Sequence, residues 1–83
     1  MKILIKYRAQ LAALTKIETE SLEAAKITDV LRHIKARFGA KAEKLAKTML
    51  IVVNGQSILL LSRFKTALKD GDEVSFLPIC GGG

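Results

Sequence analysis

The spacing of apolar residues changes along this chain, and that change constrains the fold more than any other feature of the sequence. Residues 1–8 place an apolar side chain at every second position from Ile3 to Tyr7, which is typical of a strand with one better-buried face. The same period of two returns at residues 16–21. Two strands so close together predict an antiparallel hairpin. Residues 9–15 between them form either a plain connection or a helical turn.

The middle of the chain follows a helical period instead. Residues 27–38 place apolar side chains three or four positions apart, which predicts a helix with one buried face. Thr28 is the expected N-cap, Asp29 suits the positive end of the helix dipole, and Gly39 stands where helices end. A second, weaker helical pattern covers residues 42–49. We therefore expect one main helix, followed by a shorter helical segment.

The second half of the chain returns to short strands. Residues 50–53 are a wholly apolar run of strand formers that stops at Asn54-Gly55, the strongest two-residue hairpin signal. Residues 58–61 are expected to resume as a short strand. The last strand is expected at residues 73–77, and Pro78 should end it because proline has no N–H to donate to a sheet.

These elements together predict an α+β domain. A mixed β-sheet with one main helix packed on one face buries their apolar stripes most economically. A chain of 83 residues and 9.1 kDa has room for one small domain, which we place at residues 1–78, with a flexible tail at residues 79–83. No apolar run approaches the roughly 20 residues of a membrane span, and a lone cysteine favours a cytoplasmic protein.

The formal net charge of +6 invites a nucleic-acid interpretation. Most of the excess lies in residues 32–47, where six basic residues are offset by Glu43. Proteins that bind single strands usually add aromatic side chains for stacking, whereas the four aromatic residues of this chain are widely spread. We therefore favour a solvated helix face over a nucleic-acid site, with His33 on its solvent side. One histidine and one cysteine make a structural metal site unexpected.

The sequence closes on Pro78-Ile79-Cys80-Gly81-Gly82-Gly83. Three consecutive glycines lose much backbone entropy when they are ordered, so we expect them to be mobile. One interpretation is a frayed terminus or a remnant of cloning. The other is a tail without side chains that passes through a narrow tunnel and brings its terminal carboxylate to an active site on another protein. Cys80 is expected to be a simple exposed or packed thiol.

The C-terminal stretch resembles a known family. Residues 68–78 read Leu-Lys-Asp-Gly-Asp-Glu-Val-Ser-Phe-Leu-Pro, and Gly82-Gly83 follow shortly after. This ending looks like that of the MoaD family, the small sulfur-carrying subunits of molybdopterin synthase, and residues 3–11 are similar to the family's first strand and turn. The resemblance spans essentially the whole chain and implies a β-grasp, ubiquitin-like fold. Arg8 departs from the family, which often has an aromatic residue there.

The resemblance also implies the chemistry. The pKa of a terminal carboxyl group is roughly 3.5, so at neutral pH the group is ionised and a poor electrophile. In the family, an E1-like (MoeB-like) enzyme uses ATP to adenylate the residue that corresponds to Gly83, and a sulfur then displaces AMP to leave a thiocarboxylate. Gly82 belongs to the same reacting end, and Gly81 and Cys80 would thread into the partner. The sulfur passes to a pterin precursor on a large, MoaE-like synthase subunit.

In this scheme the chain binds no cofactor itself, its partner uses the ATP, and the chain is not catalytic alone. Two related interpretations stay open. A sulfur carrier of the ThiS type, for thiazole or cysteine synthesis, would use the same chemistry at Gly83 with another acceptor. A ubiquitin-like modifier would instead join Gly83 to a lysine of another protein.

The folded body must also present a surface to its partners. Three consecutive leucines at residues 59–61 cannot all be buried on one face of a strand. We expect at least one of them to join an exposed apolar patch, the kind of surface that often marks a partner site. The alternative is that the fold closes over them. The candidate contact residues are Leu59, Leu61, Phe76 and Pro78.

Overall fold

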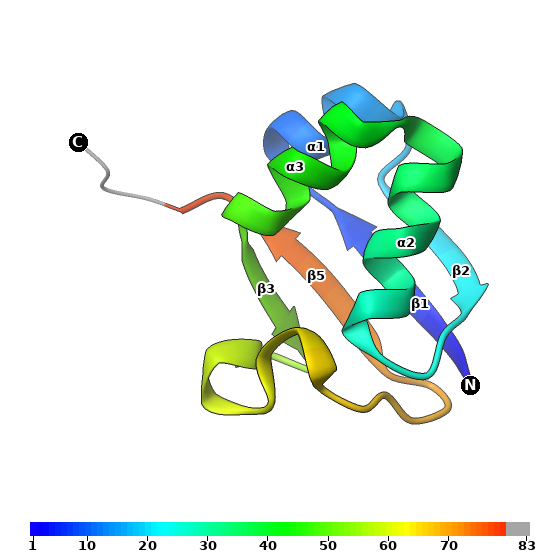
Figure 1. Ribbon diagram of the computed structural model, residues 1–83, viewed down its shortest axis with the longest axis vertical. Helices are drawn as coiled ribbons and strands as arrows, with labels where there is room; N and C mark the ends of the chain where they lie inside the picture. The colour runs from blue at the N-terminus through cyan, green and yellow to red at the C-terminus, as the bar shows by residue number, and fades with distance from the viewer. Residues whose placement is uncertain (80–83) are drawn as a thin grey trace.

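The computed structural model describes residues 1–79, in which a mixed sheet is covered by helices (Figure 1). The strands of this part of the chain are β1 (Lys2–Tyr7), β2 (Thr19–Glu23), β3 (Leu50–Val53), β4 (Gln56–Ser57) and β5 (Glu73–Leu77). The helices are α1 (Ala9–Thr15), α2 (Ile27–Phe38) and α3 (Ala40–Thr48). Two short 3-10 turns, η1 (Ile58–Leu60) and η2 (Arg63–Lys65), follow β4.

The sheet joins the first and last strands of the chain at its centre. Its strand order is β2-β1-β5-β3-β4. β1 and β5 run parallel, with Tyr7 beside Phe76, and the other neighbours are antiparallel. This order, with helices over the sheet, is the β-grasp, ubiquitin-like arrangement and confirms the predicted α+β fold.

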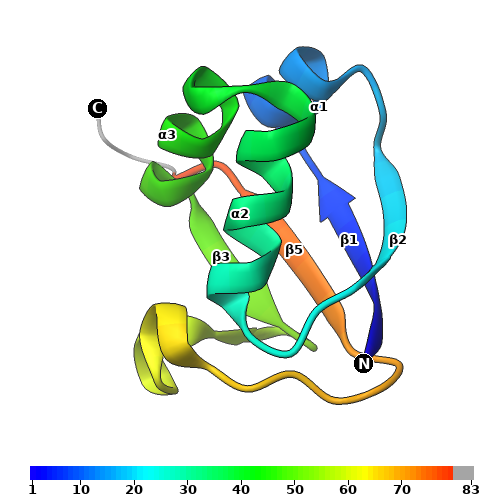
Figure 2. The ribbon, with the colours of Figure 1, turned by 45° about the vertical axis from the view of Figure 1, so that its right-hand side comes forward.

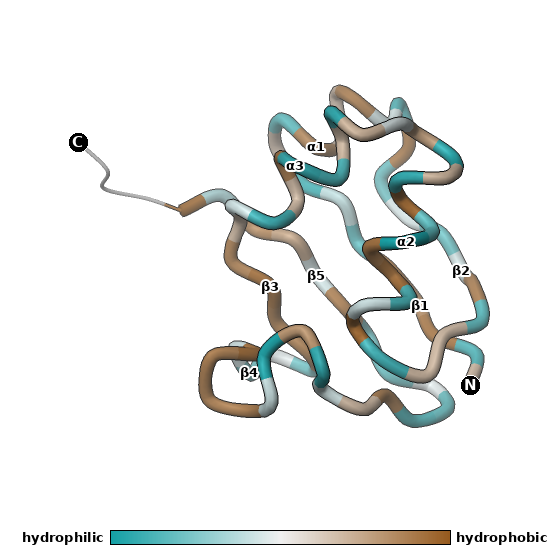
Figure 3. The backbone as a smooth tube through the Cα atoms, viewed as in Figure 1, coloured by the Kyte–Doolittle hydropathy of each residue, from teal (hydrophilic) through white to brown (hydrophobic). Residues whose placement is uncertain are grey.

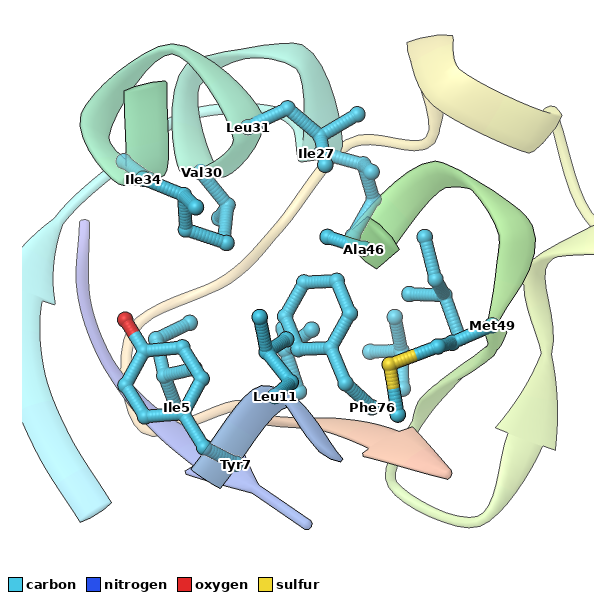
Figure 4. Close-up of a cluster of buried hydrophobic side chains, with 14 of the residues drawn as sticks. Ile5, Tyr7, Leu11, Ile27, Val30, Leu31, Ile34, Ala46, Met49 and Phe76 are labelled. Atoms are coloured by element: carbon cyan, nitrogen blue, oxygen red, sulfur yellow. The ribbon is translucent and has the colours of Figure 1, made fainter. Parts of the chain in front are cut away.

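The helices cover one face of the sheet, as Figure 2 shows. The alternate residues that the period of two marks, Ile3 to Tyr7 in β1, turn their side chains to this face and are buried. α2 meets them with the apolar stripe that its helical spacing predicted. Figure 4 shows the ring of Phe76 at the centre of this core, between the strands and the helices. Burying these side chains is the main stabilising contribution to a domain of this kind.

The residue at the N-cap of α2 differs from the predicted one. Lys26, and not Thr28, occupies the N-cap position. The capping group is the carboxylate of Asp29, which accepts hydrogen bonds from the backbone N–H groups of Ala25 (3.0 Å) and Lys26 (3.1 Å). These bonds, that of Ala25 first, hold the pKa of Asp29 below its usual range. Thr28 lies inside the first turn of α2, and the free N–H group of Ile27 is satisfied by the backbone carbonyl of Thr66 at 3.1 Å.

The expected strand at residues 16–21 lies later in the chain. α1 occupies the open connection, so the helical alternative is confirmed. The helix ends at Thr15, and the C-cap residue Lys16 has a φ of 63°, in the left-handed region. β2 therefore begins at Thr19 and ends at Glu23. Its antiparallel pairing with β1 is confirmed.

The expected strand at residues 58–61 is wrong. β4 ends at Ser57, whose hydroxyl accepts a hydrogen bond from the backbone N–H of Leu59 at 3.1 Å and begins η1. The turn leaves Leu60 76% exposed. Consecutive leucines do not alternate between an inner and an outer face, so the period of two that maintains a strand is lost here.

The predicted hairpin after β3 is confirmed. Asn54 and Gly55 have φ values of 51° and 83°, and a two-residue turn of this kind requires positive φ at both central positions. Gly39, with φ of 101°, ends α2 as predicted and is also the N-cap residue of α3.

Candidate functional site

The candidate site begins where β5 ends. Leu77, the last residue of the strand, pairs with Leu50 of β3, and Pro78 and Ile79 follow it at the surface. Pro78 thus ends the strand as predicted. The predicted reacting and threading residues lie outside the described residues; they are Cys80, Gly81, Gly82 and Gly83. Ile79, the last described residue, immediately precedes this set and lies two positions after the end of the central strand β5.

A network of hydrogen bonds fixes the other end of β5. The carboxylate of Asp72 accepts from the backbone N–H of Lys69 (2.8 Å) and from Nδ2 of Asn54 (2.9 Å). Oδ1 of Asn54 accepts in turn from the backbone N–H of Glu73 at 2.9 Å. The turn before β5 is thereby attached to the turn between β3 and β4. The N–H of Lys69 and then the amide of Asn54 hold the pKa of Asp72 below its ordinary value.

Asp72→Asn is expected to lower the free energy of unfolding at neutral pH. Because the pKa of Asp72 is lower in the folded protein than in the unfolded chain, this carboxylate contributes stability above the unfolded value of about 3.9. The contribution is lost as the pH falls through the folded pKa, so wild type and variant should converge in acid. Urea unfolding curves at neutral and acidic pH measure the difference. Glu18→Gln is the control, because the Glu18 side chain makes no hydrogen bond or ion pair within residues 1–79. A wild-type-to-variant difference that stays constant with pH would contradict this assignment.

The face of the sheet opposite the helices carries apolar side chains close to the end of β5. Leu77 and its partner Leu50 are half-buried, and so is Val52, which faces the same way. Lys6 and Glu73 cross this face as an ion pair of 2.8 Å between partly exposed side chains, a type of contact worth about 0–1 kcal/mol. Three half-buried apolar side chains therefore lie on this face beside the point where Ile79 leaves the fold, with polar side chains around them.

The predicted contact residues do not form one patch. Leu59 and Leu61 are 63% and 38% exposed, so the fold does not close over them, and Pro78 is also exposed. In Figure 1, β3 starts beside the end of β5, and η1 lies near the opposite end of β3. The prediction that Phe76 contacts a partner is wrong, because its side chain is fully buried. It occupies an inward-facing position of β5 and is not available to a partner.

A polar cluster between β1, β2 and α2 was not anticipated from the sequence. Glu20 of β2, with a side chain only 10% exposed, forms an ion pair with Arg37. It accepts a hydrogen bond from the hydroxyl of Tyr7 at 2.8 Å, and its Oε1 lies 3.1 Å from Nε2 of His33. Burial raises the pKa of Tyr7 to about 12, against the opposing effect of the Arg37 charge. The phenol therefore stays neutral and acts as a donor.

The expectation that His33 faces solvent is corrected by this cluster, in which the ring is half-buried. Each group of the cluster joins α2 to the sheet, so we assign the cluster a structural role. The sequence signal was weak because Glu20 and His33 are thirteen positions apart and lie in different elements.

Among residues 1–79, no three His, Cys, Asp or Glu side chains are grouped so that they could hold a metal ion. None of the helices in that range has the length and apolar character to span a bilayer.

Comparison with known proteins identifies relatives of this fold. The family model of the ThiS family matches residues 5–83. No curated protein matches the chain. The solution structure of small archaeal modifier protein 1 from Methanosarcina acetivorans is 25% identical, with a TM-score of 0.85, and the match covers 99% of this chain and 96% of that one.

Two further structures share the fold. The putative molybdopterin converting factor subunit 1 from Pyrococcus furiosus is 26% identical, with a TM-score of 0.71, over 94% of this chain and 97% of that one. A chain in the complex of subunits 1 and 2 of molybdopterin-converting factor from Helicobacter pylori is 23% identical, with a TM-score of 0.72, and the match covers 100% of both chains. At this last level of identity the similarity shows the fold alone.

Proposed function

The chain belongs to the ThiS family, and from that premise we propose that it carries sulfur on the terminal carboxylate of Gly83. The members of this group of folds are small ubiquitin-like sulfur carriers and protein modifiers. The observation that carries the proposal is the position of β5. This strand is held on both sides by β1 and β3, and it leads within a few residues to the glycines.

The proposed chemistry has three steps. An activating, E1-like enzyme transfers AMP from ATP to the carboxylate of Gly83, with release of pyrophosphate, so that one oxygen becomes part of a good leaving group. The terminal sulfur of a persulfide on a partner protein then attacks the carbonyl carbon and displaces AMP, which leaves an acyl disulfide. A second thiol of the partner attacks the outer sulfur of that disulfide, so that the S–S bond breaks, a partner disulfide forms and Gly83 leaves as the thiocarboxylate. The chain supplies the carbonyl group and the folded handle, and the partner supplies ATP and the catalytic groups.

Within the family we propose the role of the small subunit of molybdopterin synthase. The C-terminal stretch at residues 68–78 supports it, as does the 26% identity to the putative converting factor subunit from Pyrococcus furiosus. A MoaE-like large subunit would then bind the pterin precursor that receives the sulfur. The similarity to an archaeal modifier protein favours a second candidate, conjugation of Gly83 to a lysine of another protein.

Intact-mass measurement on protein from its native cells separates these functions. Replacement of one oxygen by one sulfur in an otherwise unmodified chain supports a carrier, and a mass series of larger conjugates supports a modifier. Identification of the acceptor requires the loaded protein to be incubated with a pterin precursor and the large subunit. A chain that is neither thiolated nor conjugated would refute the proposal.

The docking surface that we propose lies around the exit of the chain from the sheet. Pro78 and Ile79 are exposed there, and the apolar side chains of Leu50, Val52 and Leu77 continue the surface over the open face of the sheet. Leu59 and Leu61 remain proposed as contacts at a second place, around η1.

Ile79→Glu is expected to lower the kcat/KM for activation about tenfold, the effect of losing roughly 1.4 kcal/mol of binding in the transition state. Ile79 is 66% exposed, so the folded domain should lose little stability. The measurement is pyrophosphate release by the activating enzyme at varied carrier concentration. Leu14→Glu, at a partly exposed leucine of α1, is the control. Equal losses in both variants would argue against a contact at Ile79.

A further inference from the structure

A second surface, on the helical side of the protein, combines an apolar floor with basic walls. It is a groove of about 370 Å³ between α2, α3 and η2. Leu31 and Phe64 supply the apolar part. The charged residues that line the groove are Arg32, Lys35, Glu43 and Lys47.

An apolar cavity of about 220 Å³ adjoins this groove, because Lys47 and Phe64 line both. Its walls include Met49 and Ile58, and Arg63 stands at its rim. Cavities that hold a cofactor or a drug-sized ligand usually measure about 300–1,000 Å³. The smaller volume here suits one large side chain from a partner, and we call the groove and cavity together the basic groove.

The apolar part of the basic groove is partly exposed to solvent. Phe64 is 38% exposed and Leu59, on the wall of the cavity, is 63% exposed. The segment after β4 that bears the leucines is drawn in brown in Figure 3, at the outer edge of the molecule. Apolar side chains gathered in this way, beside charged ones, are typical of a protein-binding surface.

The net charge of the basic groove indicates the charge of its partner. Four cationic side chains line its two parts, and Glu43 is the single carboxylate among the lining residues. Glu43 lies 3.8 Å from Lys47. Arg32, with a side chain 78% exposed, lies 3.4 Å from Asp29, and an exposed pair of this kind is weak. A net positive potential therefore remains along the groove and complements an acidic ligand.

The aromatic residues favour a protein over a nucleic acid as this ligand. Tyr7 and Phe76 are buried, and Phe38 is half-buried with the Arg37 guanidinium 5.1 Å from its ring centre. Phe64 is thus the one aromatic side chain in the basic groove as the structure describes it. Single-stranded nucleic acids are usually held by stacking successive bases on several aromatic rings.

We propose that the basic groove binds an acidic segment of a partner protein, which places one large apolar side chain in the cavity beside Phe64. Carboxylates of the segment pair with Arg32 and Lys35 along the groove and with Lys47 and Arg63 at the rim of the cavity. This binding goes beyond the sulfur chemistry and does not depend on Gly83. Leu59 belongs to both proposed surfaces, but sulfur loading is measured at Gly83 and peptide binding at the groove, so the two proposals can fail separately.

A binding assay with the full chain tests the proposal. The probe is a fluorescent peptide of glutamates and aspartates around one phenylalanine, and fluorescence anisotropy reports its binding. The double variant Arg32→Gln/Lys35→Glu should weaken binding about tenfold, because it removes one cationic contact and reverses another. The control is Lys41→Gln/Lys44→Glu, which makes the same charge change at two exposed residues of α3 that do not line the groove. It should change binding less than about twofold.

A second peptide tests the apolar anchor. Replacing its phenylalanine by serine keeps the charge and should also weaken binding about tenfold, since the cavity then stays unfilled. In NMR spectra the acidic probe with phenylalanine should shift the amide signals of η2 and of the facing residues of α2 and α3.

Three results would overturn the proposal. The first is an equal loss of affinity in both double variants, which would indicate unspecific attraction to a basic protein. The second is unchanged binding of the serine peptide. The third is tighter binding of a single-stranded oligothymidine than of the acidic peptide, lost in Arg32→Gln/Lys35→Glu, which would assign the groove to nucleic acid.

Discussion

Deletion of Gly82 and Gly83 is expected to abolish sulfur loading and to leave the folded domain intact. The proposed reaction forms its acyl-adenylate on the carboxylate of Gly83, so a chain that ends earlier presents a different residue at a shorter reach. The described core is built from residues 3–76, which the deletion does not touch. Intact mass after incubation with the activating enzyme, ATP and a sulfur donor should show the exchange of oxygen for sulfur in wild type and none in the variant.

Cys80→Ser is the control for this experiment. A persulfide on Cys80 would also add sulfur to the chain, and this variant removes that thiol while the glycines stay in place. We expect the serine variant to be loaded as wild type is. Loss of loading in Cys80→Ser, or loss of folding on deletion of the two glycines, would contradict the carrier proposal. Thermal unfolding of each variant monitors the fold.

Phe76→Ala is expected to lower the free energy of unfolding by roughly 3–5 kcal/mol, the usual cost of truncating a fully buried phenylalanine. The ring is 0% exposed, and it lies nearly parallel to that of Tyr7 with 6.2 Å between the ring centres. Small domains are stable by only about 5–15 kcal/mol in total. The variant should therefore melt at a much lower temperature.

The matched control is Phe64→Ala, the same substitution at a ring that is 38% exposed. This ring is only partly buried, so its truncation returns less apolar surface to water and should cost clearly less stability than that of Phe76. Urea unfolding of both variants measures the difference. An unchanged transition in Phe76→Ala would show that the ring does not support the core and would restore it as a candidate contact. Any loss of sulfur loading in Phe76→Ala should follow the unfolded fraction.

The periodic segments of the sequence predicted most of the secondary structure. The helical spacing of residues 27–38 predicted α2 and its end at Gly39, and Asn54-Gly55 predicted the hairpin after β3, because these signals depend on residues close together in the chain. The error at residues 58–61 has the same origin. A run of leucines carries no period, so propensity alone suggested a strand where the Ser57 hydroxyl begins a 3-10 turn.

The sequence predicted some parts of the candidate site and not others. The glycine ending and the stretch before it were visible in the sequence, because they are local motifs. Phe76 was assigned to the surface although its alternation with Ser75 and Leu77 was seen. Alternation separates two faces of a strand but does not tell which face the helices will cover. Phe64 was overlooked because nothing near it in the sequence is periodic.

The sequence by itself determined the periodic elements β1, α2, β3 and β5, the hairpin at Asn54-Gly55 and the residues that follow the last strand, since backbone preferences and turn chemistry act over a few residues. Only the tertiary structure decided that β5 lies between β1 and β3, that Glu20 joins Tyr7 to α2, and that Phe64 closes a groove against α2 and α3. Those contacts join residues far apart in the chain, and they form because burying the apolar faces together stabilises the fold more than any local preference does.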